Sequence, residues 1–257
     1  ELHQMRVAVR RIRAALRAAR PLLDRAWADD LRAELGWLGR ALGPVRDADV
    51  LIERLRGRAA AFDESSRHAT DVLLDTLVAE REVARADMLA ALDSDRYTAL
   101  LRRLAAAVSA PLPKARGQAA KPALAELVRT EFRKLSKAVR RAGDDPPDDV
   151  LHALRILGKR LRYTGELAAT SGGKPVRKLV ASTVALQDVL GEHQDACVAK
   201  QRIVQLLDGF GDVPDRDVVF AAGRLVEREE ISRVATRGAW PAAWHQVQQR
   251  ALALQHC

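Results

Sequence analysis

His152-Ala-Leu-Arg155-Ile-Leu-Gly-Lys159-Arg160-Leu-Arg162 is one of two related stretches that decide the fold of this chain. The other stretch, close to the start, is His3-Gln-Met-Arg6-Val-Ala-Val-Arg10-Arg11-Ile-Arg13. In both stretches, basic residues follow the histidine at positions +3, +7, +8 and +10. A motif that returns in this way indicates an internal repeat, which constrains the architecture of the whole chain.

Each stretch fits one α-helix with a narrow cationic stripe. Because a helix turns by about 100° per residue, the histidine and most of the basic residues share one face, and apolar side chains lie opposite. The first stripe comprises His3, Arg6, Arg10, Arg13 and Arg17. The second comprises His152, Arg155, Lys159 and Arg162. Arg11 and Arg160 lie off the stripes and need a different partner.

The composition favours an all-α protein whose positive charge is concentrated in a few helices. Charged residues make up 30% of the 257 residues and aromatic residues 4%, and the net charge is +9. The basic residues cluster in three segments, 1–20, 129–141 and 152–162. Such clusters indicate an anionic partner.

The sequence also argues against several other classes of protein. It has no run of about 18 apolar residues that could cross a membrane. Cys197 and Cys257 form no CxxC motif, so a reducing, cytoplasmic location is expected. There is no GxxxxGK[ST] or HExxH motif, and no acidic cluster suited to Mg²⁺ beside the stripes. We therefore expect no catalytic residue, no cofactor and no enzymatic activity.

Further landmarks extend the repeat along the chain. Leu42 to Val50 is mirrored by Leu190 to Val198, and Glu80-Arg81-Glu82 by Glu227-Arg228-Glu229. With the histidine stretches, these landmarks recur at a spacing of roughly 148 residues, which predicts a duplication. The predicted halves are residues 1–110 and 123–257, joined by a linker rich in Pro, Gly and Ala at 111–122. The helix predicted at 123–142 has its expected counterpart before residue 1.

Local signals set the expected helix ends. Gly43-Pro44 predicts that one helix stops and another starts, and Ser94 fits an N-cap for a helix at 95–109. A long amphipathic helix is predicted at 64–92. The helix at 123–142 carries a third basic stripe: Arg129, Arg133, Lys137 and Arg140. We also predict that Lys178 binds the anionic partner.

The doubled pattern HxxRxxxRRxR, followed some 40 residues later by LGxxxD, resembles the CHAD family (conserved histidine α-helical domain). Lys159 departs from the motif, which has an Arg at that position. The resemblance implies two helical bundles related by a pseudo-two-fold axis, which together form one CHAD domain. It also implies binding of inorganic polyphosphate along a basic central surface or pore, and possible association with polyphosphate granules. Family members are often fused to a triphosphate-tunnel enzyme domain, which no part of this sequence resembles.

The residues support polyphosphate binding on chemical grounds as well. Polyphosphate is a flexible line of closely spaced negative charges, so its host needs many charge-assisted donors along a track, and Arg supplies bidentate ones. Binding of a nucleic-acid backbone is the main alternative. The low aromatic content argues against base stacking on single strands, but duplex binding stays open. A further alternative is an accessory domain of a triphosphate-processing enzyme.

The histidines do not predict a metal site. His3 and His152 each lack a second ligand one helical turn away, and a hydrogen bond to phosphate or to a neighbouring arginine suits them better. His193 and Cys197 are one turn apart but have no further ligand nearby in the sequence, so we interpret them as packing or surface residues.

Two acidic residues in the repeated LGxxxD motif suggest structural ion pairs. Asp47 and Asp195 could act as general bases, but a helix cap or an ion pair fits them better. We hypothesise that they pair with the off-stripe Arg11 and Arg160.

Overall fold

The structure, a computed structural model, describes residues 1–109, 120–169, 172–211 and 215–254. Within these ranges the chain forms eight α-helices and one short 3₁₀ helix, so the all-α prediction is confirmed. The elements are α1 (Leu2–Ala19), η1 (Arg20–Leu22), α2 (Arg25–Ala59), α3 (Glu64–Leu92), α4 (Asp95–Ser109), α5 (Ala120–Ala142), α6 (Asp148–Ala169), α7 (Gly173–Asp208) and α8 (Arg216–Ala253). None of the helices within these ranges combines the length and hydrophobicity that a bilayer crossing requires.

Several predicted helix boundaries are confirmed by their capping contacts. The Asp63 carboxylate accepts a hydrogen bond from the Ser66 amide at the start of α3. The Ser94 hydroxyl accepts one from the Tyr97 amide at 3.3 Å before α4. Such contacts satisfy backbone donors that have no partner within the helix.

The predicted break at Gly43-Pro44 is wrong, because α2 runs without interruption from Arg25 to Ala59. A proline inside a helix removes one backbone donor and crowds the preceding turn. Here the residues around it hold the helix together by burial, since Leu42 is 0% and Val45 2% exposed. Packing therefore outweighs the local stop signal.

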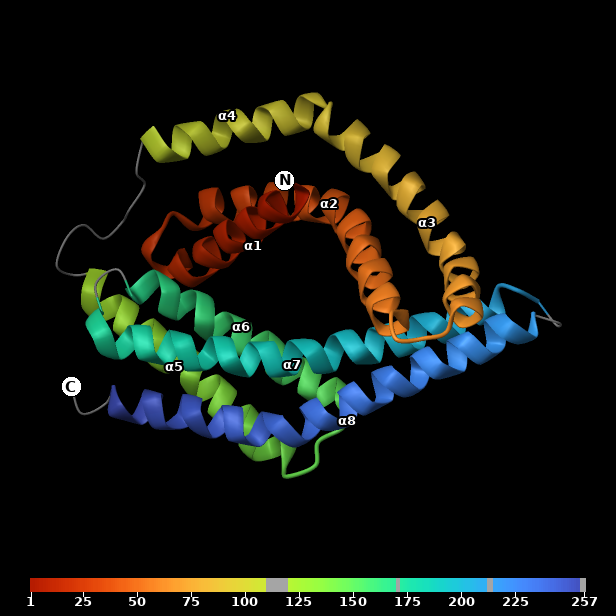
Figure 1. Cartoon of the computed structure of the whole chain (residues 1–257). Helices are drawn as coiled ribbons and strands as arrows, with labels where there is room; N and C mark the ends of the chain where they lie inside the picture. Colours follow the sequence, from red (N-terminus) through yellow and green to blue (C-terminus); the bar gives the residue numbers. More distant parts are fainter. Residues whose placement is uncertain (110–119, 170–171, 212–214, 255–257) are drawn as a thin grey trace.

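Three apolar clusters organise the molecule (Figure 1). One lies among α1 to α4 and a second among α5 to α8. The third joins them, where the end of α2 and the start of α3 meet the end of α7 and the start of α8. Each predicted half thus has a core of its own, and the third cluster joins them through the ends of α2 and α7 and the starts of α3 and α8.

In each predicted half, the helix whose cationic stripe includes a histidine is followed by a longer helix, α2 after α1 and α7 after α6. The pair α1 and α2 is followed by α3 and α4, and the pair α6 and α7 by the long α8. The duplication and the exact division into halves stay predictions. Residues 111–119 of the predicted linker lie outside the described residues, while residues 120–122 already belong to α5.

Candidate functional site

The two stripe helices meet between the halves. α1 packs along α2 and also lies against α6, which packs along α7. A cavity of about 650 Å³, here the His-lined cavity, lies among these four helices. Its basic residues and histidines are His3, Arg6, Arg10, Arg46, Arg54, His152, Arg155 and Lys159. Its acidic residues are Asp47 and Asp195.

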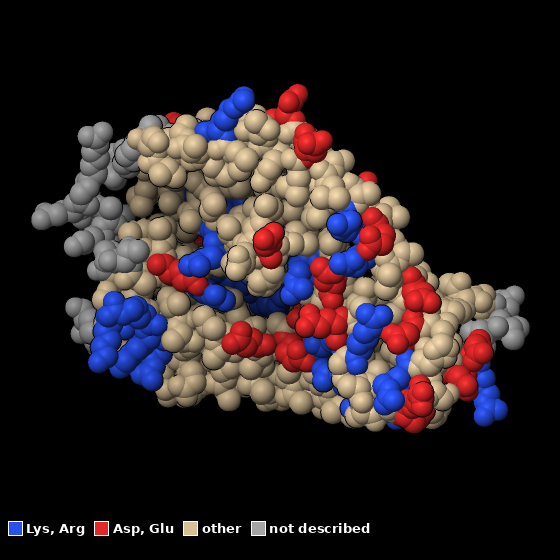
Figure 2. Space-filling view, turned by 45° about the horizontal axis from the view of Figure 1, so that its top comes forward, with Lys and Arg blue, Asp and Glu red and all other residues tan. Residues whose placement is uncertain are grey.

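A second cavity, of about 220 Å³, adjoins the first because Arg10 and Lys159 line both. We call it the Tyr-lined cavity, after Tyr163. Its charged residues are Arg10, Arg13, Arg17, Arg32, Lys159, Arg160 and Glu131. Figure 2 shows a hollow near the middle of one face, with Lys and Arg side chains in its depth and acidic side chains near its rim. The stripes of α1 and α6 therefore contribute to one connected, strongly cationic space.

A glycine of the LGxxxD motif allows α1 to approach α2 closely. Arg6 donates from Nη1 to the Gly43 carbonyl oxygen at 2.7 Å and from Nη2 to Asp47 Oδ1 at 2.7 Å. A Cβ atom at Gly43 would lie 3.2 Å from Arg6 Nη1, closer than a relaxed van der Waals contact. Gly43 thus leaves room for the Arg6 guanidinium, and Asp47 of the same motif orients it.

Several buried polar atoms in these cavities have no hydrogen-bond partner within the protein. Arg155 Nε and His152 Nδ1 are such atoms in the His-lined cavity. Arg32 Nε, Arg160 Nε and Glu131 Oε2 are such atoms in the Tyr-lined cavity. Buried polar groups in native proteins are nearly always paired, so these atoms point to a ligand that supplies the missing partners.

Lys159, which lines both cavities, has a lowered pKa. Burial, together with the charges of Arg155 and Arg10, lowers its pKa to about 8, although Asp195 opposes the effect. Like charges and desolvation both disfavour the ammonium form. An anion bound beside Lys159 would relieve both penalties.

The structure brings together most, but not all, of the predicted binding residues. His3, Arg6, Arg10, Arg13, Arg17, His152, Arg155 and Lys159 line the cavities as the helical stripes predicted. The expectation that the third stripe joins them is wrong. Arg129, Arg133, Lys137 and Arg140 are exposed and line neither cavity. α5 packs on α6 through its apolar face and turns this stripe to solvent.

Arg162 and Lys178 also lie outside both cavities. Arg162 donates to Glu166 at 2.7 Å and to Gln187 at 3.2 Å, and Lys178 is exposed on α7. These contacts hold the Arg162 guanidinium against Glu166 and Gln187 instead.

The predicted ion pairs are wrong. Asp47 pairs with the stripe residue Arg6, and Arg11 instead approaches Glu166 of α6 at 3.6 Å. Arg160 lines the Tyr-lined cavity, whereas Asp195 lines the His-lined cavity. Burial raises the pKa of Asp195, and Arg155 is the first of the cations that oppose this shift. Arg160 thus enters a cavity that stripe residues also line, although it lies off the stripe, because the packing of remote helices decides which side chains meet.

Sequence reasoning missed the arginines that α2 contributes. Arg32 enters the Tyr-lined cavity, and Arg46 and Arg54 enter the His-lined cavity. Arg54 is tied to Glu229 of α8, at 2.9 Å from its Nε to Oε1, and to Glu192 of α7, at 2.7 Å from its Nη2 to Oε1. Burial disfavours the charge of Arg54, but these hydrogen bonds outweigh it and raise its pKa. The basic residues on either side of Gly43-Pro44 in the sequence were the signal that could have identified these arginines.

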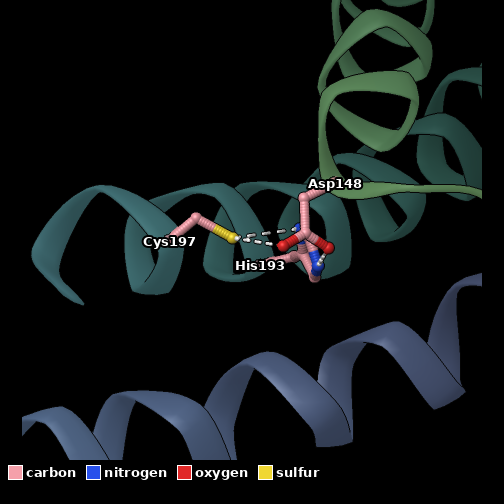
Figure 3. Close-up of side chains that lie close together, drawn as sticks. All are labelled: Asp148, His193 and Cys197. Carbon is pink, nitrogen blue, oxygen red and sulfur yellow. Dashed lines mark hydrogen bonds and ion pairs between the residues drawn. The ribbon is translucent and has the colours of Figure 1, made fainter. Parts of the chain in front are cut away.

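A separate cluster outside the cavities fixes the start of α6 (Figure 3). His193 and Cys197 lie one turn apart on α7, with His193 Nε2 3.3 Å from Asp148 Oδ1 and the thiol donating to Oδ2 at 3.6 Å. Arg233 and Arg237 of α8 donate to the same carboxylate, at 3.0 and 2.7 Å to Oδ1. Asp148 lies far from His193 and Cys197 in the sequence, so the sequence analysis did not identify it as their third partner.

The chemistry of the Asp148 cluster favours a structural lock over a metal centre. Burial lowers the pKa of His193, and burial together with Asp148 raises the pKa of Cys197 to about 11. The thiol is therefore protonated at neutral pH, and both carboxylate oxygens already accept hydrogen bonds from Arg233. The cluster holds the N-terminus of the helix that carries the second stripe.

Comparison with known proteins agrees with this architecture. The chain is 24% identical to PptA from Streptomyces chartreusis, with a TM-score of 0.77 over 95% of this chain and 90% of that one. It is 33% identical over 213 residues to two uncharacterised proteins of Mycobacterium tuberculosis, MT2285 and Rv2226, which covers 79% of this chain. The matched part spans only 40% of those relatives. Residues 1–204 match the family described as CHAD domain, and the chain belongs to that family.

Proposed function

We propose that the chain binds inorganic polyphosphate without catalysing its turnover, and that the two adjoining cavities form the binding track. The observation that carries the proposal is the set of buried, unpartnered arginine donors in a space shared by both halves. Association with polyphosphate granules belongs to the same proposal.

The charges of the His-lined cavity suit a polyanion rather than a single small anion. Six cations there outnumber the two carboxylates. Arg6 is paired with Asp47, and Arg54 with Glu192 and Glu229. Among the described residues this leaves four cavity cations outside any salt bridge: Arg10, Arg46, Arg155 and Lys159. The Tyr-lined cavity also has more cations than carboxylates, six against one. Repulsion among fixed cations costs folding free energy, which a bound chain of phosphates would offset.

The track lacks features that a base-reading or phosphate-transferring site would need. Tyr163 is the aromatic residue lining these two cavities, so a row of stacked bases has no platform there. The carboxylates of the His-lined cavity lie among arginines, where divalent cations are disfavoured. These features favour recognition of phosphate charge by binding alone.

Competition binding tests the proposed function directly. Labelled long-chain polyphosphate should bind the purified chain. The logarithm of its association constant should fall linearly with the logarithm of the salt concentration, because binding releases counterions. Duplex DNA at equal phosphate concentration should displace little of it. Efficient displacement by the duplex would instead favour a nucleic-acid binder, and metal-dependent release of phosphate would favour an enzyme.

Long-chain polyphosphate should bind less tightly as the pH rises through about 8. Lys159 has a pKa of about 8 in the free protein, and a bound polyanion stabilises its charged form. The complex therefore keeps a proton that the free protein has lost at pH 9.5, and affinity should fall roughly tenfold between pH 7 and 9.5.

The Lys159→Arg variant is the control for this pH dependence. Arg stays charged throughout the range, so the variant should keep its affinity at pH 9.5. Equal pH profiles for the variant and the unmodified chain would show that Lys159 does not contact the ligand. Circular dichroism at both pH values would check that the fold is unchanged.

A further inference from the structure

The Tyr-lined cavity holds a buried acceptor among its cations. Glu131 of α5 has Oε1 paired with Lys134 at 2.6 Å, whereas its Oε2 is buried and receives no hydrogen bond. Burial and the charge of Arg160 lower the pKa of Arg17 of α1, and the nearby Glu131 charge opposes this shift. The cavity thus presents unpaired donors, on Arg32 and Arg160, and one unpaired acceptor.

Internal and terminal units of polyphosphate differ in what they offer to such a cavity. An internal phosphate carries one strongly acidic group, so near neutral pH it offers acceptor oxygens only. Those oxygens would satisfy the arginines but would repel Glu131. A terminal phosphate resembles a phosphomonoester, whose second pKa is about 6. Its monoprotonated form therefore offers acceptors together with one P–OH donor.

We propose that the Tyr-lined cavity recognises the end of a polyphosphate chain, where Glu131 Oε2 accepts a hydrogen bond from the terminal P–OH. Arg32 and Arg160, and Arg17 beside them, bind the remaining oxygens of the same group. The rest of the chain leads past Arg10 and Lys159 into the His-lined cavity. This inference rests on the proposed function, and it adds a preference for chains with free ends.

Linear tripolyphosphate and cyclic trimetaphosphate test the inference, because only the linear molecule has ends. Binding of each is measured by calorimetry at pH 6 to the unmodified chain and to Glu131→Leu, which removes both the acceptor and the negative charge. General electrostatics predicts that this variant binds every polyanion more tightly. Recognition of the P–OH predicts that tripolyphosphate binds roughly tenfold more weakly, while trimetaphosphate binds more tightly.

A Glu131→Gln variant keeps an acceptor oxygen and should retain most of the tripolyphosphate affinity. The cyclic ligand controls for general charge effects of the variants, because it has internal phosphates but no ends. Lys159, with a pKa of about 8, stays charged at this pH. Tighter binding of both ligands by the Leu variant would overturn the inference.

Two further arms separate the possible failures. If orthophosphate, which has no chain, displaces tripolyphosphate at equal concentration, the cavity selects a lone protonated phosphate and the chain-end assignment is wrong. Long-chain polyphosphate, whose ends are few, should bind Glu131→Leu at least as tightly as the unmodified chain, because loss of the negative charge favours its internal phosphates. If it binds both but the linear and cyclic ligands respond alike, end recognition fails and the proposed function stands. If it binds neither, the proposed function itself fails.

Discussion

Reversing the charges of Arg10 and Lys159 together, to Glu, should abolish polyphosphate binding. These are the two residues that line both cavities, so every phosphate chain that passes between the cavities must contact them. A hydrogen bond to a charged group contributes about 1.5–3 kcal/mol. Loss of two such contacts, with repulsion added, should weaken binding by roughly 100-fold or more. Fluorescence anisotropy with labelled polyphosphate would measure the change.

The exposed stripe of α5 offers a matched control for this double reversal. Arg129→Glu with Lys137→Glu changes the net charge by the same amount, on side chains that line neither cavity. This control should retain most of the affinity and should lower it only through long-range electrostatics, which salt screens. Equal losses in the two double variants would place the track on a general positive surface instead.

Removing the Glu229 carboxylate should destabilise the whole fold. Glu229 is 0% exposed and accepts hydrogen bonds from Arg54 and Arg58 of the other half, at 2.9 and 3.0 Å from their Nε atoms to its Oε1. Breaking a buried ion pair leaves a partner charge uncompensated, which costs about 3–5 kcal/mol. Glu229→Ala should therefore lower the free energy of unfolding by about that amount, as urea denaturation would measure.

Glu227→Ala is the natural control, because Glu227 lies on the same helix but is exposed. Its free energy of unfolding should change by less than about 0.5 kcal/mol. A similar small effect for Glu229→Ala would mean that Glu192, which also accepts from Arg54 and Arg58, compensates for the loss. The ion pairs of Glu192 with Arg54 and Arg58 would then be sufficient to hold these arginines at the joint.

Much of this architecture is readable from local patterns. The cationic stripes on α1 and α6 follow from helical periodicity, which is a property of neighbouring residues. The start of α4 follows from the capping residue Ser94 for the same reason. Gly43-Pro44 shows the limit, because burial of the flanking residues held the helix together against a local stop signal.

The residues of the proposed binding surface depended on contacts between segments remote in the sequence. The stripe with Arg129 lacks a histidine but is as basic as the others and has the same helical period, yet α5 presents its apolar face to α6 and leaves that stripe in solvent. Arg32 and Arg54 carried no periodic signal, but α2 brings them into the cavities. Periodicity fixes which side chains share a helix face. The rotation of each helix against its neighbours, set by packing of the two halves, fixes which faces enclose a common space.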